Sequence, residues 1–381
     1  STPLYSSAAS DVYKRQQQTY FQLAFARKPE YMERSTDTEF SIQNYREADK
    51  RLAAYERISA KAEAILNKLD KEAVPAFFQL VYYNVKGAAL VNQMTLNAQK
   101  NRLYASQKRS AANLLRSRVK AYGDSLEIIT KRYNSLLNGK WQGMMSLIHG
   151  GARSFERART DSVSLSPVPT LGVSCEAADN MKGVSNVHVI PCFNKYLPQS
   201  YYVDVFNSGM GKLKWKAVPS DPWILVNKKS GATYSEERIN VSVDWSKVPV
   251  GESVSGSIDI SSGSGEKQTV FVSVFNPETP SVEELKGLYV ENNGYVSIDA
   301  TGFHRKREDA NIKFDVVEGL GFDNKVMRLG DAFAKTPYLD GLILTSNYVA
   351  PVRGDKYPVL EYDFYSFQTG PVDVYTYMMP I

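Results

Sequence analysis

Apolar residues in the first part of the chain recur every three or four positions, which is the spacing of one face of an α-helix. One such stripe runs through residues 45–69, and a second runs through residues 77–96. A third helix is indicated by the apolar positions of residues 112–137, with Gly139 as its end. The short breaks between these stretches favour antiparallel neighbours. We therefore predict a bundle of four or five helices over residues 17–160.

The pattern changes to strict alternation in the second part of the chain, which is typical of half-buried strands. The segment from Ser164 to Pro169 is rich in Ser and Pro and is interpreted as a linker. Closely spaced strands after it predict an immunoglobulin-like antiparallel β-sandwich over residues 166–277. A second linker, residues 276–280, precedes more alternating stretches, and residues 283–381 are predicted to form a C-terminal, incomplete antiparallel β-sandwich. The clearest predicted strands are Tyr201–Phe206, Ile239–Trp245, Ser257–Ile260, Thr269–Val274, Tyr295–Ile298, Ile312–Asp315, Leu342–Leu344 and Val359–Tyr365. The fold class is thus multidomain, α then β.

Both ends of the sequence look like the ends of a fragment. Residues 1–16 carry no folding pattern and are interpreted as non-native or disordered. They also contain no apolar stretch of the kind found in a signal peptide. The last ten residues read as a strand with an apolar stop, whereas natural termini usually fray in polar residues. We expect residues to be missing at both ends.

Composition narrows the class of protein. The chain has 381 residues, of which 43% are hydrophobic and 23% charged, as in ordinary globular proteins. A net charge of +5 over this length does not indicate a nucleic-acid binder. No apolar run approaches the roughly 18 residues that a membrane span needs. Cys175 and Cys192 are too few for a disulfide scaffold, and either a disulfide between them or two buried thiols fits the sequence.

The sequence contains no local catalytic or metal-binding motif. Its three histidines, His149, His188 and His304, lie far apart, and no phosphate loop, HExxH or nucleophile elbow is present. Glu361 and Asp363 alternate on one predicted strand, but a solvated strand face has the same pattern. We therefore assign no catalytic residue, no metal site and no cofactor.

One predicted helix is unusually rich in amides. Six Asn and Gln residues lie between residues 84 and 101, although Asn is a mediocre helix former. Asn84 and Asn92 lie on one face, because they are two steps of four residues apart. This face is interpreted either as a hydrogen-bonding surface that docks another segment or lines a pocket, or as a solvated surface.

The order of several sequence strings resembles the C-terminal half of glycoside hydrolase family 115, the xylan α-glucuronidases. The resemblance runs from residue 27 to the end of the chain. In the helical part it rests on NYREADKRLAAY (44–55), AFFQLVYYNVKGAALVNQ (76–93), AQKNRLYASQKRSAAN (98–113) and YNSLLNGKWQGMM (133–145). In the β-rich part it rests on YYVDVFNSG (201–209), INVSVDWSKVPVGE (239–252), YVENNGYVSIDATGF (289–303) and PVLEYDFYSFQTGPVDVYTYMMP (358–380).

This resemblance implies a parent enzyme that removes (4-O-methyl-)glucuronic acid from glucuronoxylan, with inversion and without a metal cofactor. The catalytic barrel would precede the helices in the same parent chain, so this fragment alone would be inactive. The remaining part would brace the barrel, shape the pocket or form a homodimer. The resemblance also implies a periplasmic or secreted protein. After GKWQGMM the sequence departs from the family pattern, at His149–Phe155.

Five residues are the candidates for contact with substrate: Asn92, Arg102, Lys140, Trp141 and His149. Amides can hydrogen-bond to sugar and Trp141 can stack against it. Packing between domains is the other interpretation of the same residues. For the whole chain, the alternative function is a non-catalytic carbohydrate-binding or surface adhesion protein, and a purely structural fragment is a third possibility.

Overall fold

The computed structural model describes residues 18–28, 32, 37–145, 158–177, 187–308, 313–318, 320–321, 325–330 and 358–378. It divides into two compact units, residues 1–278 and residues 279–381. Of the sequence predictions, those for residues 1–16, His149 and the strand Leu342–Leu344 lie outside the described residues.

Helices come first in the chain, as predicted. Residues 18–26 are helical. They are followed by α2 (Glu47–Leu66), α3 (Val74–Phe77), the π-helical turn η2 (Phe78–Tyr82), α4 (Tyr83–Ser106) and α5 (Ala111–Gly139). Pro75 stands in the first turn of α3, where its missing N–H leaves no hydrogen bond unmade. The α5 segment ends where Leu137, Asn138 and Gly139 adopt left-handed backbone angles, which confirms the predicted end at Gly139.

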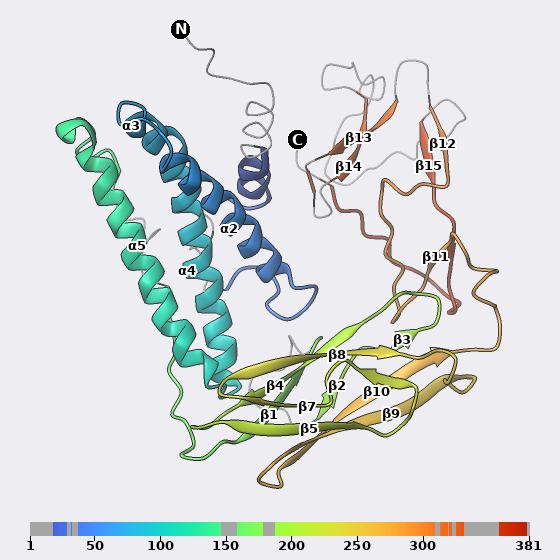
Figure 1. Cartoon of the computed structure of the whole chain (residues 1–381). Helices are drawn as coiled ribbons and strands as arrows, with labels where there is room; N and C mark the ends of the chain where they lie inside the picture. Colours follow the sequence, from blue (N-terminus) through green and yellow to red (C-terminus); the bar gives the residue numbers. More distant parts are fainter. Residues whose placement is uncertain are drawn as a thin grey trace. The chain divides into compact units, whose positions relative to one another are not determined.

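The helices pack through the faces that the apolar spacing indicates. α4 and α5 contact each other along their length, and α2 packs against α4 (Figure 1). Tyr55, Phe78 and Leu96 are buried in the common core of these helices. α4 differs from the other helices because it is buried on several sides, with Ala88 to Val91 all in the interior. Neighbouring segments therefore surround α4 more completely than they surround α2 or α5.

Two sheets form the β-rich part of the first unit. One has the strand order β1-β4-β8-β6, and the other has the order β2-β10-β9-β5-β7, with β3 also paired to β10 (Figure 1). The bounds are β1 (Leu171–Cys175), β2 (His188–Val189), β3 (Phe193–Asn194), β4 (Tyr201–Asn207), β5 (Leu213–Pro219), β6 (Ile224–Val226), β7 (Ser230–Thr233), β8 (Glu236–Val243), β9 (Gly251–Ser262) and β10 (Lys267–Asn276). Residues of both sheets share one apolar core, in which Trp215 and Trp223 are buried.

One feature of the β-rich part differs from the sequence predictions. β2 and β3 pair with β10 in parallel, so the expectation of purely antiparallel sheets is wrong here. Parallel neighbours need a long crossover connection, and the chain between β3 and β10 supplies one.

The second unit contains three two-stranded sheets in its described part. β11 (Tyr289–Val290) pairs in parallel with β16 (Phe364–Tyr365). β12 (Arg305–Arg307) pairs with β15 (Val359–Glu361), and β13 (Phe314–Glu318) pairs with β14 (Lys325–Leu329), both antiparallel. The predicted strand at Tyr295–Ile298 is wrong, because Tyr295 forms only an isolated bridge with Asn292. The chain is thus helical first and then mostly antiparallel β.

Candidate functional site

Asn92, the first candidate from the sequence, lies in the interior of the helical part. Its side chain is fully buried, accepts a hydrogen bond from Arg51 Nε at 2.7 Å and donates to the carbonyl of Ala88 at 2.8 Å. Arg51 is itself buried and donates to the carbonyls of Leu23 and Arg27. Burial lowers the pKa of Arg51. Asn92 therefore helps to bind the first helical residues to α2 and α4.

Two further amides of α4, Gln99 and Asn101, bind segments that are far away in the sequence, whereas Asn84 and Asn97 bind carbonyls of their own helical segment. Gln99 accepts from the backbone N–H of Thr38 at 2.9 Å and donates to the Thr38 and Phe40 carbonyls. Asn101 is fully buried; its Oδ1 accepts from the N–H of Asp161 at 2.8 Å and its Nδ2 donates to the Asp161 carbonyl at 3.0 Å. The amide-rich face thus acts as a hydrogen-bonding surface for other segments of the chain.

Arg102, the second candidate, takes part in the same arrangement. Its guanidinium donates to the carbonyl of Arg159 at 2.6 Å and to the Asp37 carboxylate at 2.5 Å. Burial lowers the pKa of Arg102, and the Asp37 and Asp161 carboxylates act in the opposite direction. Arg102 therefore contacts two of the segments that flank the helices.

Lys140 and Trp141 lie together just beyond the end of α5. The ammonium of exposed Lys140 is 5.1 Å from the centre of the Trp141 ring. Trp141 packs against the core of the helical part, and its buried indole Nε1 has no hydrogen-bond partner among the described residues. α4 and α5 are antiparallel, and Arg102 lies about 28 Å along α4 from the end that adjoins Trp141. The structure thus brings Lys140 and Trp141 together but places Arg102 apart from them.

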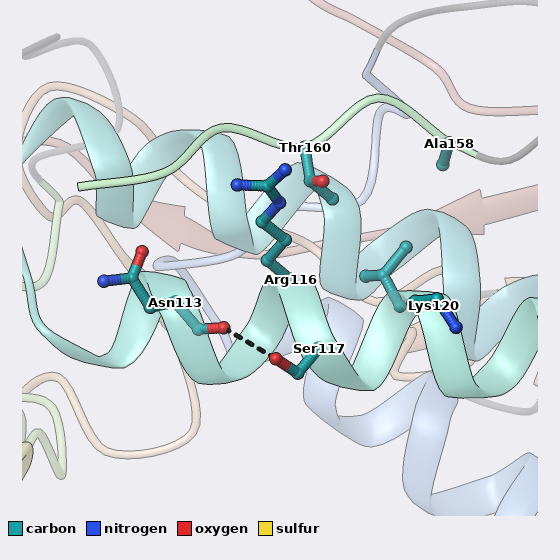
Figure 2. A pocket seen from close by; sticks show the side chains of 7 residues that line it. Asn113, Arg116, Ser117, Lys120, Ala158 and Thr160 are labelled. Carbon is teal, nitrogen blue, oxygen red and sulfur yellow. Dashed lines mark hydrogen bonds between the residues drawn. The ribbon is translucent and has the colours of Figure 1, made fainter.

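A pocket of about 420 Å³ lies between α5 and the segment that follows the helices (Figure 2). Its lining residues are Asn113, Arg116, Ser117, Val119, Lys120, Ala158 and Thr160. Arg116 extends from α5 towards Thr160, and Ser117 donates to the carbonyl of Asn113 (Figure 2). Lys120 pairs with Asp124 at 2.9 Å. The lining thus combines two cations, Arg116 and Lys120, with two hydroxyl groups and the apolar side chains of Val119 and Ala158.

Asn113 closes one end of this pocket. Its side chain accepts from the N–H of Val163 at 3.0 Å and donates to the Val163 carbonyl at 2.9 Å. Asn101 on α4 binds Asp161 in the same way, through one hydrogen bond to the backbone N–H and one to the carbonyl. Two asparagines therefore hold two peptide groups of one segment, and that segment forms a wall of the pocket.

The most deeply buried charges join the helices to the first β-rich part. Arg109 has no exposed surface, and its guanidinium donates to Asp204 at 3.2 Å and to Glu236 at 3.0 Å. It stacks between the rings of Tyr104 and Phe206, at 4.1 and 4.5 Å from their centres. Sequence analysis missed this site. The available signal was Asp204 itself, a single carboxylate in the middle of the apolar strand YYVDVF.

Opposing effects set the pKa of Asp204. Burial raises it, but Arg109 and Arg238 outweigh burial, so the pKa lies below its ordinary value. Arg238 donates to both carboxylate oxygens, at 2.7 and 3.1 Å. A carboxylate held ionised by two guanidinium groups is a structural ion, not a proton donor. We name Arg109, Asp204, Glu236 and Arg238 the junction cluster.

The two carboxylates singled out in the second unit are also structural ions. Arg305 binds Asp363 through two hydrogen bonds, of 2.7 and 2.6 Å, and binds Glu361 at 2.5 Å. The hydrogen bonds from Arg305 hold the pKa of Asp363 below its usual range. His304 accepts the N–H of Asp363 at 3.0 Å through Nδ1. Both carboxylates thus have Arg305 as an ion-pair partner.

Metal sites and membrane spans are both absent from the described part of the chain. Those residues contain no group of three or more His, Cys, Asp or Glu side chains that could hold a metal ion. None of the described helices is long and apolar enough to cross a membrane.

Comparison with solved structures found several weak likenesses. A structure named as a family GH115 4-O-methyl-alpha-glucuronidase, BtGH115A, with specificity for decorated arabinogalactans, is 18% identical with a TM-score of 0.33, and the match covers 60% of this chain and 37% of that one. A Bacteroides ovatus GH5 xyloglucanase is 11% identical with a TM-score of 0.22, covering 32% of this chain and 22% of that one. The PapD-like domain 7 of human CEP192 is 10% identical with a TM-score of 0.22, covering 36% of this chain and 99% of that one. The chain thus spans little more than a third of the length of the glucuronidase that it matches.

Comparison of the sequence with family models is more specific, whereas comparison with curated proteins found no match. Residues 288–381 match the model of the glycosyl hydrolase family 115 C-terminal domain. These residues include the strings YVENNGYVSIDATGF and PVLEYDFYSFQTGPVDVYTYMMP, on which part of the resemblance rests. Residues 288–381 are therefore similar to the C-terminal domain of family 115 glycosyl hydrolases.

Proposed function

We propose that this chain is the accessory helical and β-rich portion of an α-glucuronidase that removes (4-O-methyl-)glucuronic acid from glucuronoxylan. The observation that carries the proposal is the match of residues 288–381 to the family 115 C-terminal domain. In this proposal the catalytic barrel belongs to the same parent chain and precedes the helices. The parent is periplasmic or secreted, and it forms a homodimer.

The proposed role of this portion is to brace the barrel. Its domains are a helical bundle (17–160), an immunoglobulin-like β-sandwich (166–277) and a C-terminal β-sandwich (283–381). The junction cluster supports a bracing role, because buried ion pairs with several hydrogen bonds fix the orientation of the two parts that they join. The asparagine contacts to Asp161 and Val163 support it in the same way.

Among the five candidate residues, we propose that sugar contact is made through Lys140 and Trp141, together with His149. Exposed Lys140 can pair with a uronate, and the half-buried ring of Trp141 can stack on a sugar. Asn92 and Arg102 would act on substrate indirectly, through the segments that they hold in place.

The test is release of glucuronic acid from glucuronoxylan, measured for the 381-residue chain and for the full-length parent. We expect release by the parent and none by the 381-residue chain. Release by the 381-residue chain would show that the catalytic groups lie within it. A parent that binds glucuronoxylan but releases nothing would instead favour the carbohydrate-binding or adhesion alternative. Light scattering of the parent tests the homodimer.

A further inference from the structure

The sheet formed by β2, β3, β10, β9, β5 and β7 has an outer face that points away from the apolar core. Packing in the core does not account for the residues on this face. In β5, Leu213, Trp215 and Ala217 point into the core, so Lys214, Lys216 and Val218 point outwards. In β10, Val270 and Val272 point into the core, so Phe271 between them points outwards and is 50% exposed. An outward phenylalanine in the middle of a sheet gains little from the fold that contains it.

Strand register places these outward residues in rows across the sheet. Phe271 lies between Val189 on β2 and Ser257 on β9. Two residues further along β9, Asp259 lies between Thr269 and Val218. The next row pairs Lys216 with Ser261 on β9 and Ser230 on β7. The face thus changes from apolar through hydroxyl-bearing to cationic over four residues, or about 13 Å along the strands.

The charges on this face do not balance. Asp259 accepts a hydrogen bond from Thr269 on its own row and pairs at 2.8 Å with Lys267, which lies opposite Ser261 on the next row. In contrast, Lys214 and Lys216 have no carboxylate within ion-pair distance among the residues that the structure describes. They lie two residues apart on one strand and point the same way, so they repel each other. An anion with two or more negative charges would relieve this repulsion.

The size and chemistry of the face favour a carbohydrate over a protein. Its exposed apolar residues are few: Val189 and Phe271 are neighbours, and Ser257 and Asp259 on β9 separate them from Val218. A protein interface usually needs a continuous apolar centre and more than about 1,000 Å² of buried surface. A polysaccharide needs less: one aromatic ring for the C–H face of a sugar, hydroxyl partners, and cations where it carries carboxylates.

We propose that this face binds a uronate-bearing polysaccharide, with a sugar ring on Phe271 and uronate carboxylates at Lys214 and Lys216. We name Lys214, Lys216 and Phe271 the sheet-face site. The separation of Phe271 from the two lysines requires a ligand of several sugar units rather than a single uronic acid. The choice of glucuronoxylan as the natural ligand rests on the proposed function. The cationic and aromatic character of the site is independent of that function, because it follows from the structure.

The experiment measures binding of the 381-residue chain to glucuronoxylan and to unsubstituted xylan by affinity electrophoresis. We expect binding to glucuronoxylan that weakens as salt is raised, because exposed ion pairs are screened. Phe271→Ala, and separately the double variant Lys214→Gln/Lys216→Gln, should each weaken binding about fivefold. Only the lysine variant should lose the salt dependence.

Matched controls lie elsewhere in the first unit. Lys247→Gln removes a lysine that already pairs with Asp244, and Phe21→Ala, in the helical part of the same unit, removes a phenylalanine ring that is 62% exposed. Both controls should bind like the unaltered chain. All of these side chains are exposed, so each variant should keep its circular dichroism spectrum and melting temperature.

Three outcomes would overturn the proposal: unchanged binding by both sheet-face variants, equal losses in the controls, or equal binding of unsubstituted xylan. These results are separable from those for the proposed function. If the variants bind normally while the parent releases glucuronic acid, the sheet-face site is wrong and the proposed function stands. If the variants lose binding while the parent releases nothing, the sheet-face site stands and the proposed function is wrong.

Discussion

The guanidinium of Arg109 lies 3.2 Å from the carboxylate of Asp204, although 95 residues separate them in the sequence. Arg109 precedes α5 and Asp204 lies on β4, so this pair joins the helices to the first β-rich part. Both side chains are buried, and Glu236 and Arg238 complete the cluster. A buried ion pair adds little net stability against an apolar replacement of both partners, but losing one partner leaves an unpaired buried charge.

Replacing Arg109 should therefore weaken the whole first unit. We expect Arg109→Met to lower the free energy of unfolding by about 3 kcal/mol, measured by urea denaturation, because Asp204 keeps only Arg238 as a partner. Arg116→Met is the control, since Arg116 is exposed on α5 and should change stability by no more than about 0.5 kcal/mol. Equal and small effects of both variants would contradict a structural role for the cluster.

Periodicity was sufficient to predict most of the regular structure. The 45–69 stripe became α2, and the alternation in Thr269–Val274 became β10, because each pattern reports the face that local geometry buries. Tyr201–Phe206 became β4, although that strand is buried on both faces. Periodicity could not predict η2 or the parallel pairing of β2 and β3. The π-helical turn and the parallel pairing depend on contacts between distant segments, and local periodicity carries no information about such contacts.

The candidate site was less predictable than the fold for the same reason. The abundance of amides on α4 was visible, but not that Asn101 would bind the backbone at Asp161, 60 residues later. Nothing in the sequence shows that Arg102 and Trp141 lie near opposite ends of α4. The sheet-face residues Lys214 and Lys216 became visible only when strand register placed them on one exposed face.

Removal of a buried amide should loosen the segment that it holds. We expect Asn101→Ala to cost about 2 kcal/mol of unfolding free energy, because it leaves buried backbone groups of Ala112 and Asp161 without their partner. Hydrogen exchange should become faster at the amide of Asp161. Asn84→Ala is the control: Asn84 is exposed and binds only its own helix, at the carbonyl of Leu80. A large effect of Asn84→Ala, or none of Asn101→Ala, would contradict this interpretation.

Two glycines should respond in opposite directions to the same substitution. A Cβ at Gly209 would lie 1.8 Å from the carbonyl oxygen of Val168, so Gly209→Ala must displace backbone and should destabilise by about 2–4 kcal/mol. A Cβ at Gly87, within α4, would meet nothing within 4 Å. Gly87→Ala should therefore stabilise the chain by about 0.5–1 kcal/mol, as expected for a helix interior. Thermal melting of both variants tests the pair, and a matching sign would contradict it.

His188 should make stability depend on pH near neutrality. Burial lowers the pKa of His188 below its ordinary value of 6.5, and a hydrogen bond with Gln268 only partly offsets this. The unfolded chain then binds a proton at a higher pH than the folded chain does. The contribution of neutral His188 to the free energy of unfolding is therefore fully present above pH 6.5. It is lost as the pH drops towards the pKa of His188 in the folded chain. Urea denaturation at about pH 7.5 and about pH 5.5 should show the loss, and His188→Gln should reduce it. An unchanged difference in His188→Gln would assign the effect to other groups.

The two cysteines should differ in reactivity, since both are thiols and no disulfide joins them. Burial raises the pKa of Cys175 to about 12, so almost none of it is the reactive thiolate at neutral pH. Cys192 is only half-buried and should react first with an aromatic disulfide reagent. We expect one thiol to be labelled in the folded chain and two in denaturant, without added reductant. Cys192→Ser should abolish the fast phase, and Cys175→Ser should leave it intact. Failure to label any thiol in denaturant would instead show that the two cysteines are joined.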